Sequence, residues 1–167
     1  MPGMDTLYND LDTPGGDGLT VHRLTALNRS IALTSLALGA LSGMLIGLWS
    51  FGGPAPVPDA IGEYGDISRR LLRLGHIAFF GLAFLNLILA RQIPSLPLGL
   101  KAKRGALGCI NFGNVALPAA LIAAAFWEPL KYLTAPPAFA VTLALCIAAW
   151  GGWSDYGQPD PGKEHQR

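Results

Sequence analysis

Four long apolar stretches alternate with polar ones along this chain of 167 residues. They cover about residues 30–51, 74–91, 105–127 and 137–153, and apart from Arg91, which closes the second, they contain no Asp, Glu, Lys or Arg. About 17 or more uncharged residues are enough to cross a bilayer core of roughly 30 Å as a helix. The pattern therefore predicts an all-α integral membrane protein, a four-transmembrane-helix bundle with short loops and polar, flexible termini.

The polar segments divide the chain into three parts. Residues 1–29 are expected to form a polar arm, with a possible short interfacial helix at 21–30. Residues 30–153 form the membrane domain, and residues 154–167 form a disordered tail. The prolines and glycines of the loop after the first span are typical of irregular chain outside the lipid.

Composition agrees with this interpretation. Hydrophobic residues make up 51% of the chain and charged residues 14%, whereas soluble domains carry about 25% charged residues. The net charge of +1 provides no basic field that would favour a nucleic-acid partner. Both cysteines, Cys109 and Cys146, lie in apolar runs, where a free thiol usually acts as a small packing residue.

The distribution of basic residues predicts the orientation in the membrane. Basic residues gather in cytoplasmic loops, and a cytoplasmic N-terminus places most of the 12 Lys and Arg inside. This set comprises Arg23, Arg29, Arg91, Lys101, Lys103, Arg104, Lys163 and Arg167. We therefore expect a multi-pass protein of a bacterial-type inner (plasma) membrane with both termini in the cytoplasm.

The exception to this distribution is the start of the second span. Arg69, Arg73 and His76 fall at i, i+4 and i+7, which is one face of a helix, on the side that the charge rule disfavours. They are candidates to bind a lipid headgroup, a haem or a quinone. His22 and His165 lie far from His76 in the predicted topology, so a second haem ligand would have to come from a partner chain. The favoured interpretation is structural: His76 donates to a neighbouring backbone carbonyl, and the arginines bind headgroups or loop acids.

Two further sets of residues indicate contacts between helices. Gly39, Gly43 and Gly47 form a ridge of small residues that lets another helix approach closely. Asn86, Asn111 and Asn114 are expected at a similar depth on antiparallel spans, where amides in lipid hydrogen-bond to one another. These sets are interpreted as packing positions; a dimer contact for the glycines and a polar binding pocket for the asparagines are the alternatives.

The sequence shows no catalytic constellation. It contains no nucleophile–histidine–acid set, no paired carboxylates, no metal-ligand spacing and no phosphate loop, so we expect no enzyme activity and no cofactor of its own. The favoured function is that of a non-catalytic accessory or structural subunit of a larger membrane complex, such as one of respiratory or photosynthetic electron transfer. Its expected partners are membrane lipids and other membrane subunits.

Two alternative functions remain. One is a redox subunit that binds haem b or a quinone through His76, with a second ligand from a partner chain. The other is a small-molecule transporter, which is disfavoured because no polar residues line a path through all depths of the membrane.

Overall fold

The structure, a computed structural model, describes residues 14–50, 52–63 and 65–156. The elements are α2 (Pro14–Gly47), α3 (Ile67–Gln92), α4 (Leu100–Phe126), the short 3₁₀ helix η1 (Glu128–Thr134) and α5 (Ala135–Tyr156). No strand occurs in this described part, which confirms the predicted all-α fold. The predicted flexible residues 1–13 and 157–167 lie outside the described residues.

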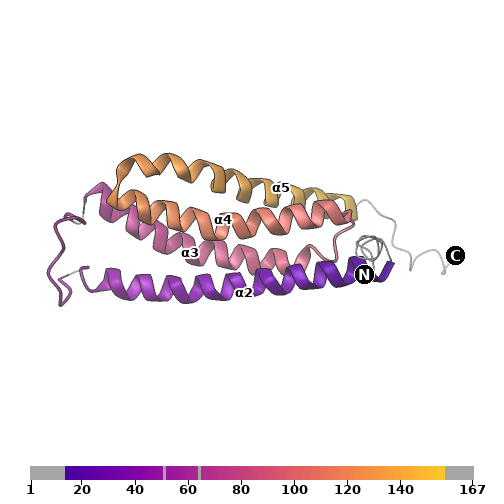
Figure 1. The fold of residues 1–167 in the computed structure, drawn as a ribbon, viewed down its shortest axis with the longest axis horizontal. Helices are drawn as coiled ribbons and strands as arrows, with labels where there is room; N and C mark the ends of the chain where they lie inside the picture. The colour runs from indigo at the N-terminus through magenta and orange to yellow at the C-terminus, as the bar shows by residue number, and fades with distance from the viewer. Residues whose placement is uncertain (1–13, 51, 64, 157–167) are drawn as a thin grey trace, which may run out of the picture.

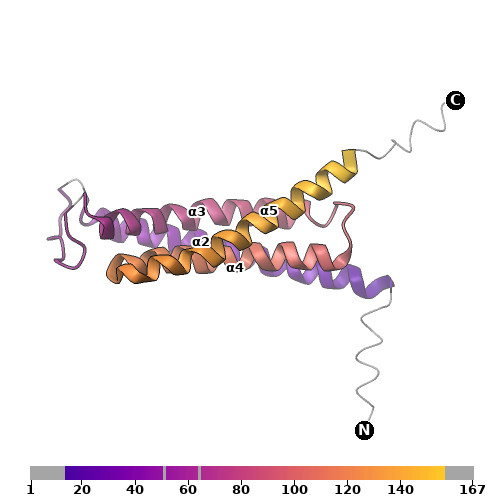
Figure 2. The same ribbon diagram turned by 90° about the horizontal axis from the view of Figure 1, so that it is seen from above.

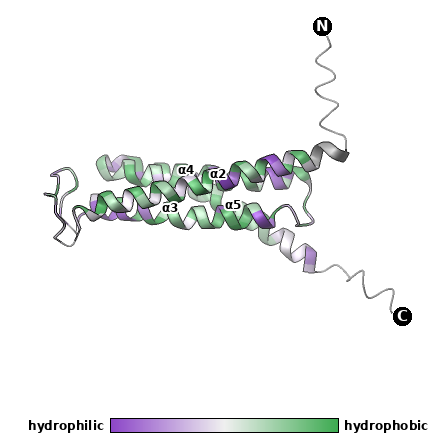
Figure 3. Cartoon of the chain, turned by 90° about the horizontal axis from the view of Figure 1, so that it is seen from below, coloured by the Kyte–Doolittle hydropathy of each residue, from purple (hydrophilic) through white to green (hydrophobic). Residues whose placement is uncertain are grey.

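The four long helices run along one another as an elongated bundle (Figure 1). The start of α2, the α3–α4 connection and the end of α5 lie at one end, which we name the α3–α4 end. The long α2–α3 connection and η1 lie at the opposite α2–α3 end. Apolar residues cover most of the helix surfaces between these ends (Figure 3). All four helical stretches, of 26 to 30 residues, are long and apolar enough to cross a membrane.

The helix boundaries differ from the predicted spans mainly at α2. Residues 14–29, which were expected to form an arm and an interfacial helix, are continuous with the first span. From Leu19 to Leu38 the sequence contains neither glycine nor proline, so nothing in it interrupts the helix. Asn28 within this extension and Ala32 just after it are buried, and Leu24 packs against the main core. The first helix therefore begins 16 residues, or about four turns, before the predicted span.

α4 is the central helix of the bundle. It packs on α2, α3 and α5, whereas α5 packs chiefly on α4 and crosses it obliquely (Figure 2). The main apolar core joins α3, α4 and α5 with the start of the α3–α4 connection, and it consists of Leu82, Leu89, Ile93, Ala106, Leu107, Ile110, Val141 and Ala144. Two prolines in the connection, Pro94 and Pro97, separate α3 from α4, as their lack of a backbone donor requires.

Two of the three ridge glycines make the expected close contact between helices. A Cβ atom added to Gly39 would lie 2.9 Å from the Phe80 ring, and one added to Gly43 would lie 2.6 Å from Cε1 of His76. Gly47 has no such neighbour within 4 Å. Gly39 and Gly43 therefore pack α2 on α3 within this chain, and Gly47 lies beyond the contact.

Replacing Gly43 with alanine is expected to destabilise the bundle. The new methyl group would overlap His76, whose ring is fixed by hydrogen bonds to α2. Overpacking of this kind costs about 1–3 kcal/mol. Gly47→Ala is the matched control, and because its site is open it should change stability by less than about 1 kcal/mol. Reversible unfolding in detergent micelles, followed by circular dichroism, measures both; equal effects would contradict the assigned contact.

Candidate functional site

Three asparagines from three helices form a closed ring of hydrogen bonds. Asn28 Nδ2 of α2 donates to Asn86 Oδ1 of α3 over 2.7 Å, and Asn86 Nδ2 donates to Asn111 Oδ1 of α4 over 2.9 Å. Asn111 Nδ2 closes the ring by donating to Asn28 Oδ1 over 2.8 Å. Asn28 Nδ2 also donates to the Leu107 carbonyl oxygen, 3.3 Å away. We name this group the asparagine ring.

The asparagine ring fixes the relative depth of α2, α3 and α4. Asn28 and Asn86 are completely buried, so neither amide can turn to water. An unpaired amide in such surroundings costs about 1–3 kcal/mol, and interhelical hydrogen bonds in membranes contribute about 0.6–2 kcal/mol each. A shift of one helix along its axis would break two bonds of the ring at once. The ring therefore specifies one register among three otherwise apolar helices.

The sequence identified two members of this ring and missed the third. Asn86 and Asn111 hydrogen-bond to each other at a shared depth, but Asn114 is not part of the ring. Asn28 takes the third place, although it had been assigned to the polar arm. A signal was present: Asn28, Ala32 and Gly39 fall at i, i+4 and i+11, on one helical face that leads into the glycine ridge.

Asn114 is buried without a partner. Its side chain is 0% exposed, and neither Nδ2 nor Oδ1 has a hydrogen bond within the described part of the chain. Pro118 stands four residues later inside α4 and has no N–H to donate to the Asn114 carbonyl oxygen. The Asn114 amide is thus a buried polar group of α4 without a hydrogen bond in the described part of the chain, as is Nε of Arg104 near the start of the same helix.

His76 faces α2. Its Nδ1 lies 2.9 Å from the Gly39 carbonyl oxygen and 3.1 Å from Ser42 Oγ, and its ring meets Phe80 edge-on with centroids 5.3 Å apart. A carbonyl can only accept, so Nδ1 carries a proton and donates to Gly39. This is the backbone contact that the sequence offered as the alternative to a ligand role. Nε2 makes no hydrogen bond within the described residues.

Arg69 binds the end of α2. One of its guanidinium nitrogens donates to the carbonyl oxygen of Trp49, in the turn that follows Gly47, and the residue is 6% exposed. Carbonyls at a helix C-terminus lack helical partners and carry the negative end of the helix dipole. The α2 C-terminus therefore stabilises a cation that the start of α3 would otherwise disfavour. Arg73 is half-buried on the same helix.

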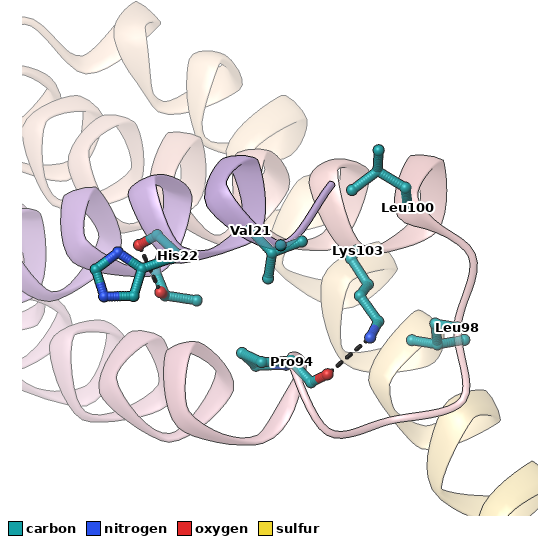
Figure 4. Close-up of a pocket in the computed structure, with 8 residues that line it drawn as sticks. Val21, His22, Pro94, Leu98, Leu100 and Lys103 are labelled. Carbon is teal, nitrogen blue, oxygen red and sulfur yellow. Dashed lines mark hydrogen bonds between the residues drawn. The ribbon is translucent and has the colours of Figure 1, made fainter. Parts of the chain in front are cut away.

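A cleft of about 540 Å³ opens at the α3–α4 end, between the start of α2 and the α3–α4 connection (Figure 4). Val21 and His22 line it from α2, and Pro94 and Lys103 line it from the other side. Lys103 Nζ donates to the Pro94 carbonyl oxygen over 2.7 Å, so its ammonium group is tied to the wall. Within the described residues, no three His, Cys, Asp or Glu side chains gather as a metal site would require.

The fold and these contacts fit the class of multi-pass helical membrane proteins. In this chain most of the interior polar side chains described above form hydrogen bonds to other groups of the same chain. Comparison of the chain with protein-family models, curated proteins and solved structures found no match.

Asn86 and Asn114 should respond in opposite ways to replacement by leucine, whose side chain has the same number of non-hydrogen atoms. Asn86→Leu removes two hydrogen bonds of the asparagine ring and leaves buried partners unpaired, so we expect a loss of about 1–4 kcal/mol. Asn114→Leu removes an amide that has no partner and should be neutral or stabilising. Unfolding in mixed micelles compares the two variants. An equal loss at both positions would contradict the special role of the ring.

Proposed function

We propose that this protein is a non-catalytic subunit of a bacterial-type inner membrane, and that α5 binds a transmembrane helix of another subunit. The observation that carries the proposal is the environment of α5. This helix packs chiefly on one neighbour, α4, and the opposite side of α5 combines exposure with small side chains. The polar interior supports the proposal, because the asparagine ring uses its amides to hold the helices together.

The two faces of α5 have different compositions. The buried face meets α4 through residues such as Val141 and Ala144. Close approach is enforced at Gly113 of α4, where an added Cβ would collide with Val141. The exposed side of the helix includes the small residues Ala138, Thr142, Cys146 and Ala149, and bulky aromatic residues such as Trp153 lie beside them. We name these four residues the small face of α5.

Small residues at four-residue spacing let a second helix approach closely in a membrane, where close packing and not hydrophobicity drives association. The exposed side of α2 also mixes bulky residues such as Leu41 and Met44, which are 56% and 71% exposed, with small ones. The difference between the helices is one of packing, because α2 contacts both α3 and α4 whereas α5 packs chiefly on α4. The outlying position of α5 favours a protein partner at this helix.

The proposed orientation follows the basic residues. Arg23, Arg29, Arg91 and Lys101 belong to the α3–α4 end of the bundle, which the positive-inside rule assigns to the cytoplasm. Both ends of the described chain lie at this same end (Figure 1). We therefore propose cytoplasmic termini, with the Arg69 contact on the opposite side of the membrane.

Site-specific photo-crosslinking in native membranes tests the α5 interface. A photoreactive residue at position 142 or 149 should give one discrete protein adduct of the same mass, while positions 41 and 44 on α2 should give none. Ala149→Phe, which fills the small face, should reduce the adduct formed from position 142. Leu41→Phe is its matched control and should leave the adduct unchanged.

The other outcomes would overturn the proposal. Equal adducts from α2 and α5 would show unselective contact, and the absence of an α5 adduct would show a face covered by lipid. An adduct with the mass of two copies of this chain would mean that the partner is a second copy, in conflict with an accessory role in another complex.

A second candidate function, a redox subunit, is favoured by the fixing of His76. A histidine whose Nδ1 donates to a backbone carbonyl presents Nε2 as the remaining ligand atom, as in many metal and haem sites. A haem would need its second ligand from a partner chain. A quinone would accept a hydrogen bond from the protonated His76 ring, and the reduced quinol would donate a hydrogen bond to it.

The redox candidate predicts a visible haem absorption band, or a co-purifying quinone, in the complex isolated from native membranes. His76→Ala should abolish it, whereas His22→Ala, the matched control, should not. A colourless, quinone-free complex would exclude this candidate and leave the structural role of His76 against Gly39.

A further inference from the structure

We propose that the cleft between α2 and α3 near the α3–α4 end binds an anionic phospholipid, with Arg29 and Arg91 on its phosphate. The cleft has a volume of about 560 Å³ and is lined by Thr25 and Arg29 of α2 and by Leu87, Ile88, Ala90 and Arg91 of α3. One guanidinium group thus comes from each helix. Basic pockets between transmembrane helices on the cytoplasmic side are suited to anionic headgroups.

The two arginines approach the cleft from different heights. Arg29 lies one residue to the interior side of Asn28, whereas Arg91 lies five residues, roughly 7.5 Å along the helix axis, beyond Asn86 toward the α3–α4 end. Because side chains lean toward the N-terminus of their helix, the two guanidinium groups lean toward each other. The hydrogen bond between Asn28 and Asn86 sets the two helices in this relation. Long arginine side chains can extend from such positions toward the membrane surface while their stems remain in apolar surroundings. Both guanidinium groups can thus meet one phosphate at the interface.

Arg29 and Arg91 make no hydrogen bond or ion pair within the described part of the chain, where the one salt bridge joins Lys131 to Glu128 near the α2–α3 end. Most of the acids whose side chains the structure describes, Asp59, Glu63, Asp66 and Glu128, lie toward that end. Asp155, which lies near the end of α5, is exposed. Two cations that line one cleft without a carboxylate partner among the described side chains favour an anionic ligand.

The apolar part of the cleft indicates a lipid rather than a free anion. Leu87 and Ile88 form its deeper wall, and Ile88 is 49% exposed. One turn further along α3, Phe84 is 55% exposed on the same face. This apolar surface begins at the arginines and runs toward the membrane interior, as an acyl chain below a phosphate does. Guanidinium groups bind phosphate oxygens by paired, charge-assisted hydrogen bonds. The two arginines therefore suit the lipid phosphate, and the apolar surface suits the acyl chain.

Native mass spectrometry of the full-length chain in neutral detergent tests this inference, with phosphatidylglycerol as the probe and phosphatidylcholine as the reference lipid. Arg29→Gln with Arg91→Gln should lower phosphatidylglycerol affinity about 30-fold, if each arginine contributes as a basic residue does beside an anionic membrane. The control is Arg23→Gln with Lys101→Gln, which removes two exposed charges at the same end but outside the cleft; it should retain the lipid.

If the double variant misfolds, the single variants Arg29→Gln and Arg91→Gln still test the inference. The affinity of each for phosphatidylglycerol should be about fivefold lower than that of the wild type. Phosphatidylglycerol should also raise the thermal unfolding midpoint of the wild type, because a ligand of the folded state stabilises it, and should do so less in the cleft variants.

Several results would overturn the inference. Equal losses in the cleft and control variants would indicate general charge attraction, and full retention in the cleft variants would place the lipid elsewhere. Displacement of the lipid by inorganic phosphate at similar concentration would identify a small-anion site instead. The assay uses the isolated chain, so its outcome is independent of the α5 interface and of the proposed subunit role.

Discussion

The hydrogen bonds among Asn28, Asn86 and Asn111 are the constraint on which the rest of the bundle depends. Apolar helices in lipid have little reason to choose one register over another, because a shifted helix exchanges one apolar contact for a similar one. Amides remove this freedom, since a buried amide must find a partner. Once the ring sets the heights of α2, α3 and α4, Gly43 meets His76, and the end of α2 lies beside Arg69.

Most polar groups of the interior therefore form hydrogen bonds within the chain, and these groups are not available to bind a substrate. His76 and Arg69 both bind backbone carbonyls of α2 or of the turn after it. These contacts bind Nδ1 of His76 and the Arg69 guanidinium, and leave Nε2 of His76 without a hydrogen bond among the described residues. Asn114, close to Pro118 on α4, departs from this pattern, as does Nε of Arg104. The chemistry left for partners lies on the surface, at the small face of α5 and in the cleft between Arg29 and Arg91.

The sequence was sufficient for the architecture, because charge and apolarity separate spans from connections. It was insufficient for the contacts. Asn28 stands between Arg23 and Arg29, and those charges made its segment resemble an interfacial arm although the helix buries it. The acceptors for Arg69 and His76 are carbonyls, which every residue carries, so no residue type reveals them. The outlying place of α5 was equally hidden, since its apolar run looks like the other three.

The ring also has a consequence for the order in which the protein is made. Synthesis delivers the N-terminal helices first, so Asn28 and Asn86 are in place and can pair before Asn111 emerges. The first helical hairpin can therefore form one hydrogen bond of the ring by itself, and Asn111 of α4 then supplies the partners that Asn28 and Asn86 still lack. α5 emerges after the ring is complete and packs chiefly on α4. The last helix can thus dock late, or together with another chain, without disturbing the register of the first three.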